Sequence, residues 1–143
     1  MGSSRVLVLL LLSATVMAVT ADVVSLTDAT YADKLKEQDT LWFIKFFAPW
    51  CGHCRTLAPT WEKLGTALAD ESGIEVASVD CTTSKATCTK ADIRSYPSLK
   101  IFYNGEEVKK YQGARDLESL KAFVLQEYAE ATKAAKSEEA AVL

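Results

Sequence analysis

The sequence predicts an α/β domain in which helices flank a central mixed sheet, and three observations support this class. Short apolar segments typical of strands alternate with segments whose apolar residues recur at helical spacing. The segment 41–48 is apolar almost throughout, as expected for a strand inside a sheet with both faces covered. Asn104-Gly105 is a two-residue hairpin signal, which adds an antiparallel strand pair.

A strand and a short helix are predicted before the central strand. Residues 23–26 form an apolar run, which predicts the strand. Thr27 is expected to cap the helix, which would carry Tyr31 and Leu35 on its buried side.

A longer helix is predicted to open at Cys51, after the central strand. Four apolar residues recur along it at helical spacing: Leu57, Trp61, Leu64 and Leu68. Pro59 falls inside this helix and is expected to bend its axis, because proline deletes one backbone hydrogen bond. Gly73 ends the helix, and residues 74–79 form the next predicted strand.

The second half of the chain predicts a short helix, a hairpin and a last helix. The polar segment 80–88 leads into the short helix. Strands at 99–103 and 108–111 flank the hairpin turn. Asp116 is expected to cap the last helix, whose buried stripe consists of Leu117, Leu120, Val124 and Tyr128.

The two ends of the chain differ from the domain, which we place at residues 22–131. Residues 1–21 are expected to be a secretory signal, because Arg5 precedes a largely apolar run that ends in small residues. The alternative is an uncleaved anchor, but the run is shorter than the roughly 20 residues of a membrane span. Residues 132–143 are mainly Ala, Lys and Glu without an apolar stripe, so we expect a frayed helical end or a disordered tail.

The charge balance argues against a nucleic-acid partner. The 143 residues carry a formal net charge of −3, and removing Arg5 with the signal leaves 15 basic against 19 acidic residues, or −4. No basic cluster stands out. No segment after the signal is apolar enough to span a membrane, so we expect no membrane association once the signal is cleaved.

The segment Ala48–Cys54 is the predicted site of chemistry. It contains two cysteines separated by two residues, of which one is His53. A helix that opens at Cys51 would direct free N–H groups and the positive end of its dipole at that sulfur, which favours the reactive thiolate. Cys54, one turn later, would be close enough to displace a substrate bound to Cys51.

Two alternatives apply to this segment. A Cys-x-x-Cys pair also forms half of a zinc site, but a second ligand pair with matching spacing is absent from the sequence. His53 is either a cation that stabilises the thiolate of Cys51 or an exposed polar residue.

The sequence from Phe47 through Cys54, FAPWCGHC, resembles the active site of the thioredoxin-like domains of protein disulfide isomerases. The resemblance covers roughly residues 23–130 and implies the thioredoxin fold and thiol–disulfide oxidoreductase and isomerase activity without a cofactor. It assigns catalytic roles to Cys51, Gly52, His53 and Cys54. Cys51 would attack a substrate disulfide and Cys54 would resolve the mixed disulfide. The implied partners are unfolded or disulfide-containing proteins, with glutathione or an upstream thiol oxidase reloading the site.

The resemblance also assigns a substrate-binding loop. Tyr96 and Pro97 match the family's cis-proline loop, whose backbone binds extended peptide, and Trp50 belongs to the same surface. Arg94 resembles an arginine that swings toward the second active-site cysteine and lowers its pKa. The alternative for Arg94 is a solvated surface side chain.

A second cysteine pair, Cys81 and Cys88, resembles one found in some isomerase-like domains. A disulfide is geometrically possible if the two Cα atoms approach within roughly 7 Å. We interpret the pair as a structural disulfide, with a regulatory role as the alternative.

Two positions depart from the family. Lys45 stands where the family usually has a buried Glu or Asp that accepts the proton of the second cysteine, and Ser78 stands where many isomerase domains have a lysine. Three roles for Lys45 follow: a neutral base for Cys54, a cation that lowers the pKa of Cys54, or a side chain that reaches solvent without contacting Cys54.

The predicted compartment is the secretory pathway, with the lumen of the endoplasmic reticulum as the expected site. The C-terminus, 140–143, lacks the Lys/His-Asp-Glu-Leu retention signal, so secretion is the alternative. The alternative function is a peptide-binding chaperone module that holds unfolded chains near Pro97, with incidental cysteines.

Overall fold

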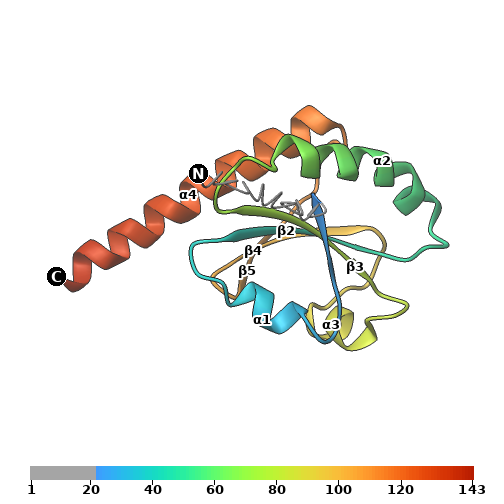
Figure 1. Cartoon of the computed structure of the whole chain (residues 1–143), viewed down its shortest axis with the longest axis horizontal. Helices are drawn as coiled ribbons and strands as arrows, with labels where there is room; N and C mark the ends of the chain where they lie inside the picture. Colours follow the sequence, from blue (N-terminus) through green and yellow to red (C-terminus); the bar gives the residue numbers. More distant parts are fainter. Residues whose placement is uncertain (1–21) are drawn as a thin grey trace, which may run out of the picture.

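The computed structural model describes residues 22–143, in which five strands form one sheet between two layers of helices (Figure 1). The elements are β1 (Val23–Leu26), α1 (Tyr31–Leu35), β2 (Leu41–Phe47), α2 (Gly52–Ala67), β3 (Ile74–Asp80), α3 (Lys85–Lys90), β4 (Ser98–Tyr103), β5 (Glu106–Lys110) and α4 (Leu117–Val142). This order confirms the predicted α/β class with a mixed sheet. The expected signal at residues 1–21 lies outside the described residues.

The sheet has the strand order β1-β3-β2-β4-β5, with β2 in the middle. β2 pairs with β3 in parallel and with β4 in antiparallel orientation, and β5 continues the antiparallel half. Six of the seven residues of β2 are buried, which explains its nearly continuous apolar sequence. The chain leaves the carboxyl end of this central strand directly into the segment that contains Cys51.

Helices α2 and α4 cover one face of the sheet, and α1 and α3 cover the other (Figure 1). On the α2 face, the ring centres of Phe43 and Trp61 lie 4.8 Å apart. The indole N–H of Trp61 donates to the carbonyl of Ala77 in β3 at 3.0 Å. Because α2 is tied to the sheet by buried contacts, its N-terminus is held firmly at the end of β2.

The hairpin between β4 and β5 confirms the predicted turn. Asn104 and Gly105 have positive φ angles of 50° and 85°, the conformation that this two-residue turn requires. The turn leads directly into β5, which therefore begins at Glu106 rather than at the predicted Val108.

The predicted cap of α1 is wrong by three residues. The helix begins at Tyr31 with Thr30 at the N-cap position. Thr27 instead forms a turn, in which its carbonyl accepts hydrogen bonds from the N–H groups of Thr30 and Tyr31 at 3.1 and 2.9 Å. A threonine hydroxyl favours a turn as readily as a helix cap, so the sequence pattern did not separate the two.

The C-terminal segment is helical. α4 continues through residues 132–142 and projects beyond the rest of the domain (Figure 1). We expected either a frayed helical end or a disordered tail here, and the structure contains a helix. Ala, Lys and Glu are strong helix formers even where they bury no apolar stripe. Within residues 22–143, no helix combines the length and the apolar character needed to cross a membrane.

Candidate active site

Cys51 lies at the N-terminus of α2, where the loop from the central strand ends. Its backbone N–H donates to the carbonyl of Ala48 at 3.1 Å. Cys51 is the N-cap residue of α2, and its Sγ accepts a hydrogen bond from the N–H of Cys54 at 3.2 Å. The helix therefore opens at the predicted residue and directs backbone donors at this sulfur.

The surroundings of Cys51 favour its thiolate. The pKa of Cys51 is lowered, above all by the hydrogen bond with the side chain of Cys54. The backbone N–H groups of Cys54 and His53 and the positive charge of Arg115 lower this pKa further, while desolvation opposes them. The residue is 8% exposed, so its sulfur lies at the edge of the surface.

The surroundings of Cys54 raise its pKa, whereas those of Cys51 lower the pKa of that residue. Cys54 is 3% exposed, and both cysteines are free thiols in the structure. Burial raises the pKa of Cys54, and the side-chain hydrogen bond with Cys51 and the negative charge of Cys51 raise it further. The positive charge of Lys45 acts in the other direction. The surroundings therefore favour the thiolate form at Cys51 and the protonated thiol at Cys54.

Cys51 is expected to be alkylated at a lower pH than Cys54. A thiol with a lowered pKa carries thiolate at pH values where a thiol with a raised pKa is still protonated, and only the thiolate reacts. The reduced protein would be treated with iodoacetamide from about pH 5 to about pH 9, and each cysteine followed by peptide mass spectrometry. Earlier labelling of Cys54, Cys81 or Cys88 would contradict this order.

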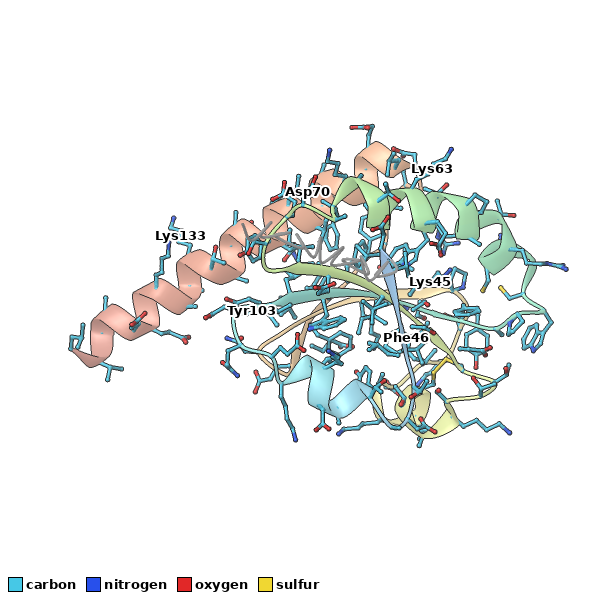
Figure 2. The ribbon with its side chains drawn as sticks, in the orientation of Figure 1. Lys45, Phe46, Lys63, Asp70, Tyr103 and Lys133 are labelled. Atoms are coloured by element: carbon cyan, nitrogen blue, oxygen red, sulfur yellow. A yellow bond between two sulfur atoms is a disulfide. The ribbon has the colours of Figure 1, made fainter. Side chains whose placement is uncertain are left out.

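Lys45 lies in β2, and its side chain projects to the face covered by α2, opposite that of Phe46 (Figure 2). It is 6% exposed, and its Nζ lies 4.8 Å from the centre of the Phe47 ring. Burial lowers the pKa of Lys45, while the negative charges of Glu62 and Cys54 oppose this change. The charges of Lys45 and Cys54 thus affect each other's pKa, and together with the burial of Lys45 this favours the two roles that involve Cys54.

The loop before β4 faces the cysteines. The Tyr96–Pro97 peptide bond is cis, as the resemblance implies. The Sγ of Cys51 lies 3.6 Å from the carbonyl oxygen of Tyr96 and donates to it as a thiol. The Trp50 side chain is 67% exposed and meets the Tyr96 ring edge to face, with ring centres 5.8 Å apart. Trp50, Cys51 and the loop therefore share one surface.

The two residues between the cysteines are exposed. A side-chain carbon built at Gly52 would meet nothing within 4 Å, so Gly52 leaves open space beside Cys51. His53 contributes its backbone N–H to the stabilisation of the Cys51 thiolate. The imidazole of His53 forms no hydrogen bond within the part of the chain that the structure describes.

The structure does not bring Arg94 to the cysteines. Its side chain is 84% exposed, and its Nε donates to the carboxylate of Asp92 at 3.0 Å. The cation that does act on Cys51 is Arg115, in the loop between β5 and α4. Sequence reasoning missed Arg115, because only the folded chain places this loop next to Pro97.

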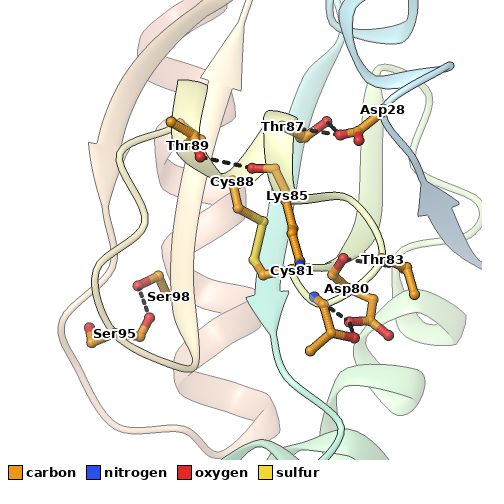
Figure 3. Close-up of a disulfide and its surroundings, with 12 residues drawn as sticks. Asp28, Asp80, Cys81, Thr83, Lys85, Thr87, Cys88, Thr89, Ser95 and Ser98 are labelled. Atoms are coloured by element: carbon orange, nitrogen blue, oxygen red, sulfur yellow. Dashed lines mark hydrogen bonds between the residues drawn. A yellow bond between two sulfur atoms is a disulfide. The ribbon is translucent and has the colours of Figure 1, made fainter.

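The second cysteine pair is joined by a disulfide (Figure 3). The Cα atoms of Cys81 and Cys88 lie 5.6 Å apart, and both residues are buried. The disulfide connects the end of β3 to α3. The carboxylate of Asp28 also holds α3, because it accepts hydrogen bonds from the N–H and the hydroxyl of Thr87 at 2.8 and 2.7 Å. These contacts keep the short helix α3 in place on the sheet.

Replacing Cys81 and Cys88 with serine is expected to lower the melting temperature with little effect on turnover at moderate temperature. In the chain-entropy model, closing a loop of this size contributes on the order of 2.5 kcal/mol to the free energy of unfolding. Differential scanning calorimetry and a disulfide-rearrangement assay would measure the two properties. Loss of turnover in a variant of unchanged stability would favour the regulatory role.

The structure contains no arrangement of protein ligands typical of a metal centre within residues 22–143. No group of three or more His, Cys, Asp or Glu side chains is arranged to hold a metal ion there.

The fold and the paired thiols define a thioredoxin-like redox protein, and comparisons with known proteins agree. The thioredoxin family model matches residues 22–126. Protein disulfide-isomerase 5-1 of Arabidopsis thaliana is 52% identical over 133 residues, which cover 93% of this chain and 91% of that protein. Protein disulfide isomerase-like 5-1 of Oryza sativa subsp. japonica is 52% identical over 114 residues, which cover 80% of this chain and 78% of that protein. The chain belongs to the protein disulfide isomerase branch of the thioredoxin family.

A solved structure gives the same result for the fold. The J-Trx1 fragment of ERdj5 superimposes with a TM-score of 0.69 at 32% sequence identity. The match covers 76% of this chain and 52% of that fragment, so this chain spans about half of the fragment's length.

Proposed function

We propose that this protein forms, reduces or rearranges disulfides in protein substrates of the secretory pathway, in the lumen of the endoplasmic reticulum. The observation that carries this proposal is the pair of free thiols at the N-terminus of α2, with the pKa of Cys51 lowered and that of Cys54 raised. The relatives that are 52% identical and named as protein disulfide isomerases support the same activity.

In the reducing direction, the Cys51 thiolate attacks one sulfur of a substrate disulfide. A mixed disulfide forms, and the other substrate sulfur leaves as a thiolate that takes up a proton. Cys54 then loses its proton and attacks the Sγ of Cys51, which releases the second substrate thiolate and forms the Cys51–Cys54 disulfide. Two electrons have moved from the dithiol to the substrate, and oxidation of a substrate dithiol is the reverse of these steps.

Isomerisation and reloading use the same sulfurs. While the mixed disulfide persists, the freed substrate thiolate can attack a second substrate disulfide, which forms a new disulfide and releases another substrate thiolate. When that thiolate attacks the mixed disulfide and expels the Cys51 thiolate, the pairing has changed without net electron transfer. A net oxidation leaves the site as a dithiol, which glutathione disulfide or an upstream thiol oxidase would convert back to the disulfide. A net reduction leaves a disulfide, which two molecules of glutathione would reduce.

The cis-proline loop would hold the substrate chain. As a thiol, Cys51 donates to the Tyr96 carbonyl at 3.6 Å, but a thiolate has no proton to donate. Ionisation of Cys51 therefore frees this carbonyl for an N–H of an extended substrate. The exposed ring of Trp50 supplies apolar area beside it, and a protonated His53 would further stabilise the thiolate.

Replacing both Cys51 and Cys54 with alanine tests the proposed function. The variant is expected to lose rearrangement of a scrambled disulfide-containing protein, down to the rate without catalyst, because no nucleophile remains at the site. The Cys81→Ser, Cys88→Ser variant is the control with an equal number of sulfurs removed. Full rearrangement activity in the Cys51→Ala, Cys54→Ala protein would overturn the proposal, and retained suppression of aggregation alone would support the peptide-binding alternative.

A further inference from the structure

A basic hollow lies beside the proposed site, on the far side of the cis-proline loop. Its volume is about 320 Å³. Its lining residues come from the loop before β4, from the end of β5 and from the segment between β5 and α4: Ser95, Pro97, Lys110, Tyr111, Gln112, Gly113 and Arg115. Two of these residues are cations and none is acidic, so the hollow carries positive charge although the whole chain is acidic.

The two cations of the hollow form no ion pair with a carboxylate of the described residues. Within residues 22–143, neither Lys110 nor Arg115 forms a salt bridge. Three other basic residues of this half of the chain are each paired with an acid: Arg94, Lys100 and Lys109. No ion pair within the described residues therefore competes with a bound anion for these two cations.

The loop that carries Arg115 is built from specific contacts. The hydroxyl of Tyr111 donates to the carbonyl of Ala114, and the Tyr111 ring lies against Phe123 with ring centres 4.6 Å apart. A Cβ at Gly113 would lie 2.6 Å from the Tyr111 hydroxyl, so any larger residue there would displace this hydroxyl from its position. These contacts fix the backbone that presents Arg115.

The neighbouring carboxylate, that of Asp116, forms no salt bridge with Arg115 among the described residues. Asp116 caps α4, and its two oxygens accept hydrogen bonds from the N–H and the hydroxyl of Ser119 at 2.9 and 2.7 Å. Its acceptor capacity is thereby directed into the helix rather than toward the hollow.

We propose that this hollow binds a side-chain carboxylate of the protein substrate, so that the protein prefers cysteines with a nearby Asp or Glu. The inference rests on the proposed function. Pro97 lines the hollow and follows Tyr96, whose carbonyl faces Cys51. A chain bound along this loop therefore passes the two cations within a few residues of its reacting cysteine. A carboxylate seated in the hollow would lie within the Debye length of the two cations, which is about 8 Å at physiological ionic strength. Salt would therefore screen their attraction only in part.

The preference is tested with three peptide disulfides that differ at one residue beside the cysteine, which is Glu, Gln or Lys. The reduced protein would be mixed with each peptide, and the second-order rate constant of disulfide reduction measured. We expect the Glu peptide to react about two- to fivefold faster than the Gln peptide, as for exposed ion pairs, and the Lys peptide to react slowest. Raising the salt concentration should reduce the difference.

The Lys110→Gln variant tests whether the preference for the Glu peptide arises in the hollow. Lys110 is exposed and has no part in the proposed chemistry. The variant is expected to lose most of the preference for the Glu peptide while reducing the Gln peptide at the parent rate. Lys133→Gln, which makes the same charge change on the projecting part of α4 (Figure 2), should retain the preference.

The outcomes separate the hollow from the proposed function. Equal rates for the three peptides, or an equal loss of preference in Lys110→Gln and Lys133→Gln, would overturn the inference and leave thiol–disulfide exchange in place. No reduction of any peptide would instead overturn the proposed function itself.

Discussion

Replacing Cys54 with alanine is expected to convert the protein from a catalyst into a covalent trap for its substrates. Cys51 retains its position at the N-terminus of α2 and its attack on disulfides, but the intramolecular release step is lost. Well-oriented intramolecular reactions have effective molarities of about 10⁵–10⁸ M, which external thiols do not approach. We therefore expect the mixed disulfide to persist at least about 100-fold longer than in the parent protein.

Non-reducing electrophoresis after acid quenching would measure the trapped species. The Cys51→Ala variant is the matched control and should form no adduct through this site, because Cys54 is buried and its pKa is raised. Adducts that form equally well in both variants, or through Cys81 or Cys88, would contradict the assigned order of attack.

The Lys45→Met variant is expected to slow release of the mixed disulfide by about 10-fold or more, with little change in the first attack. Positioned proton acceptors typically contribute a factor of about 10² to 10⁴. Lys45 is buried, its pKa is lowered, and its charge lowers the pKa of Cys54. Either as a neutral amine that takes the Cys54 proton or as an ammonium beside the thiolate, it promotes the step that needs Cys54 as a nucleophile. Methionine keeps much of the apolar stem and removes the charge.

Rapid-quench measurements of mixed-disulfide formation and decay would separate the two steps. With Lys45 removed, the raised pKa of Cys54 should make release depend steeply on pH, with the rate rising as the solution becomes more alkaline. Lys63→Met, an exposed change on α2, is the control, and Lys45→Glu would show whether a carboxylate restores the step. Equal mixed-disulfide lifetimes in Lys45→Met and the parent at every pH would remove Lys45 from the mechanism.

The sequence predicted the fold well because its signals are local. The continuous apolar run of β2, the stripe of α2 and the Asn104-Gly105 turn each reflect a single element and its burial. The start of α2 at Cys51 was also predictable, because the apolar residues after it recur at helical spacing.

The surroundings of the cysteines were less predictable because they depend on contacts between distant segments. The motif could not show that the loop between β5 and α4 brings the charge of Arg115 to Cys51 and leaves Arg94 paired with Asp92. The face on which Lys45 lies depends on strand register, and the same side-chain alternation places Phe46 on the opposite face.

Redox equilibration with glutathione tests the central claim most directly, namely that Cys51 and Cys54 form one reversible two-electron couple. Protein equilibrated over a series of glutathione ratios would be acid-quenched, alkylated and analysed by peptide mass spectrometry. We predict one transition between the dithiol and the Cys51–Cys54 disulfide, at a potential nearer the about −180 mV of protein disulfide isomerase than the about −270 mV of thioredoxin. A transition confined to Cys81 and Cys88, with Cys51 and Cys54 never joined, would contradict it.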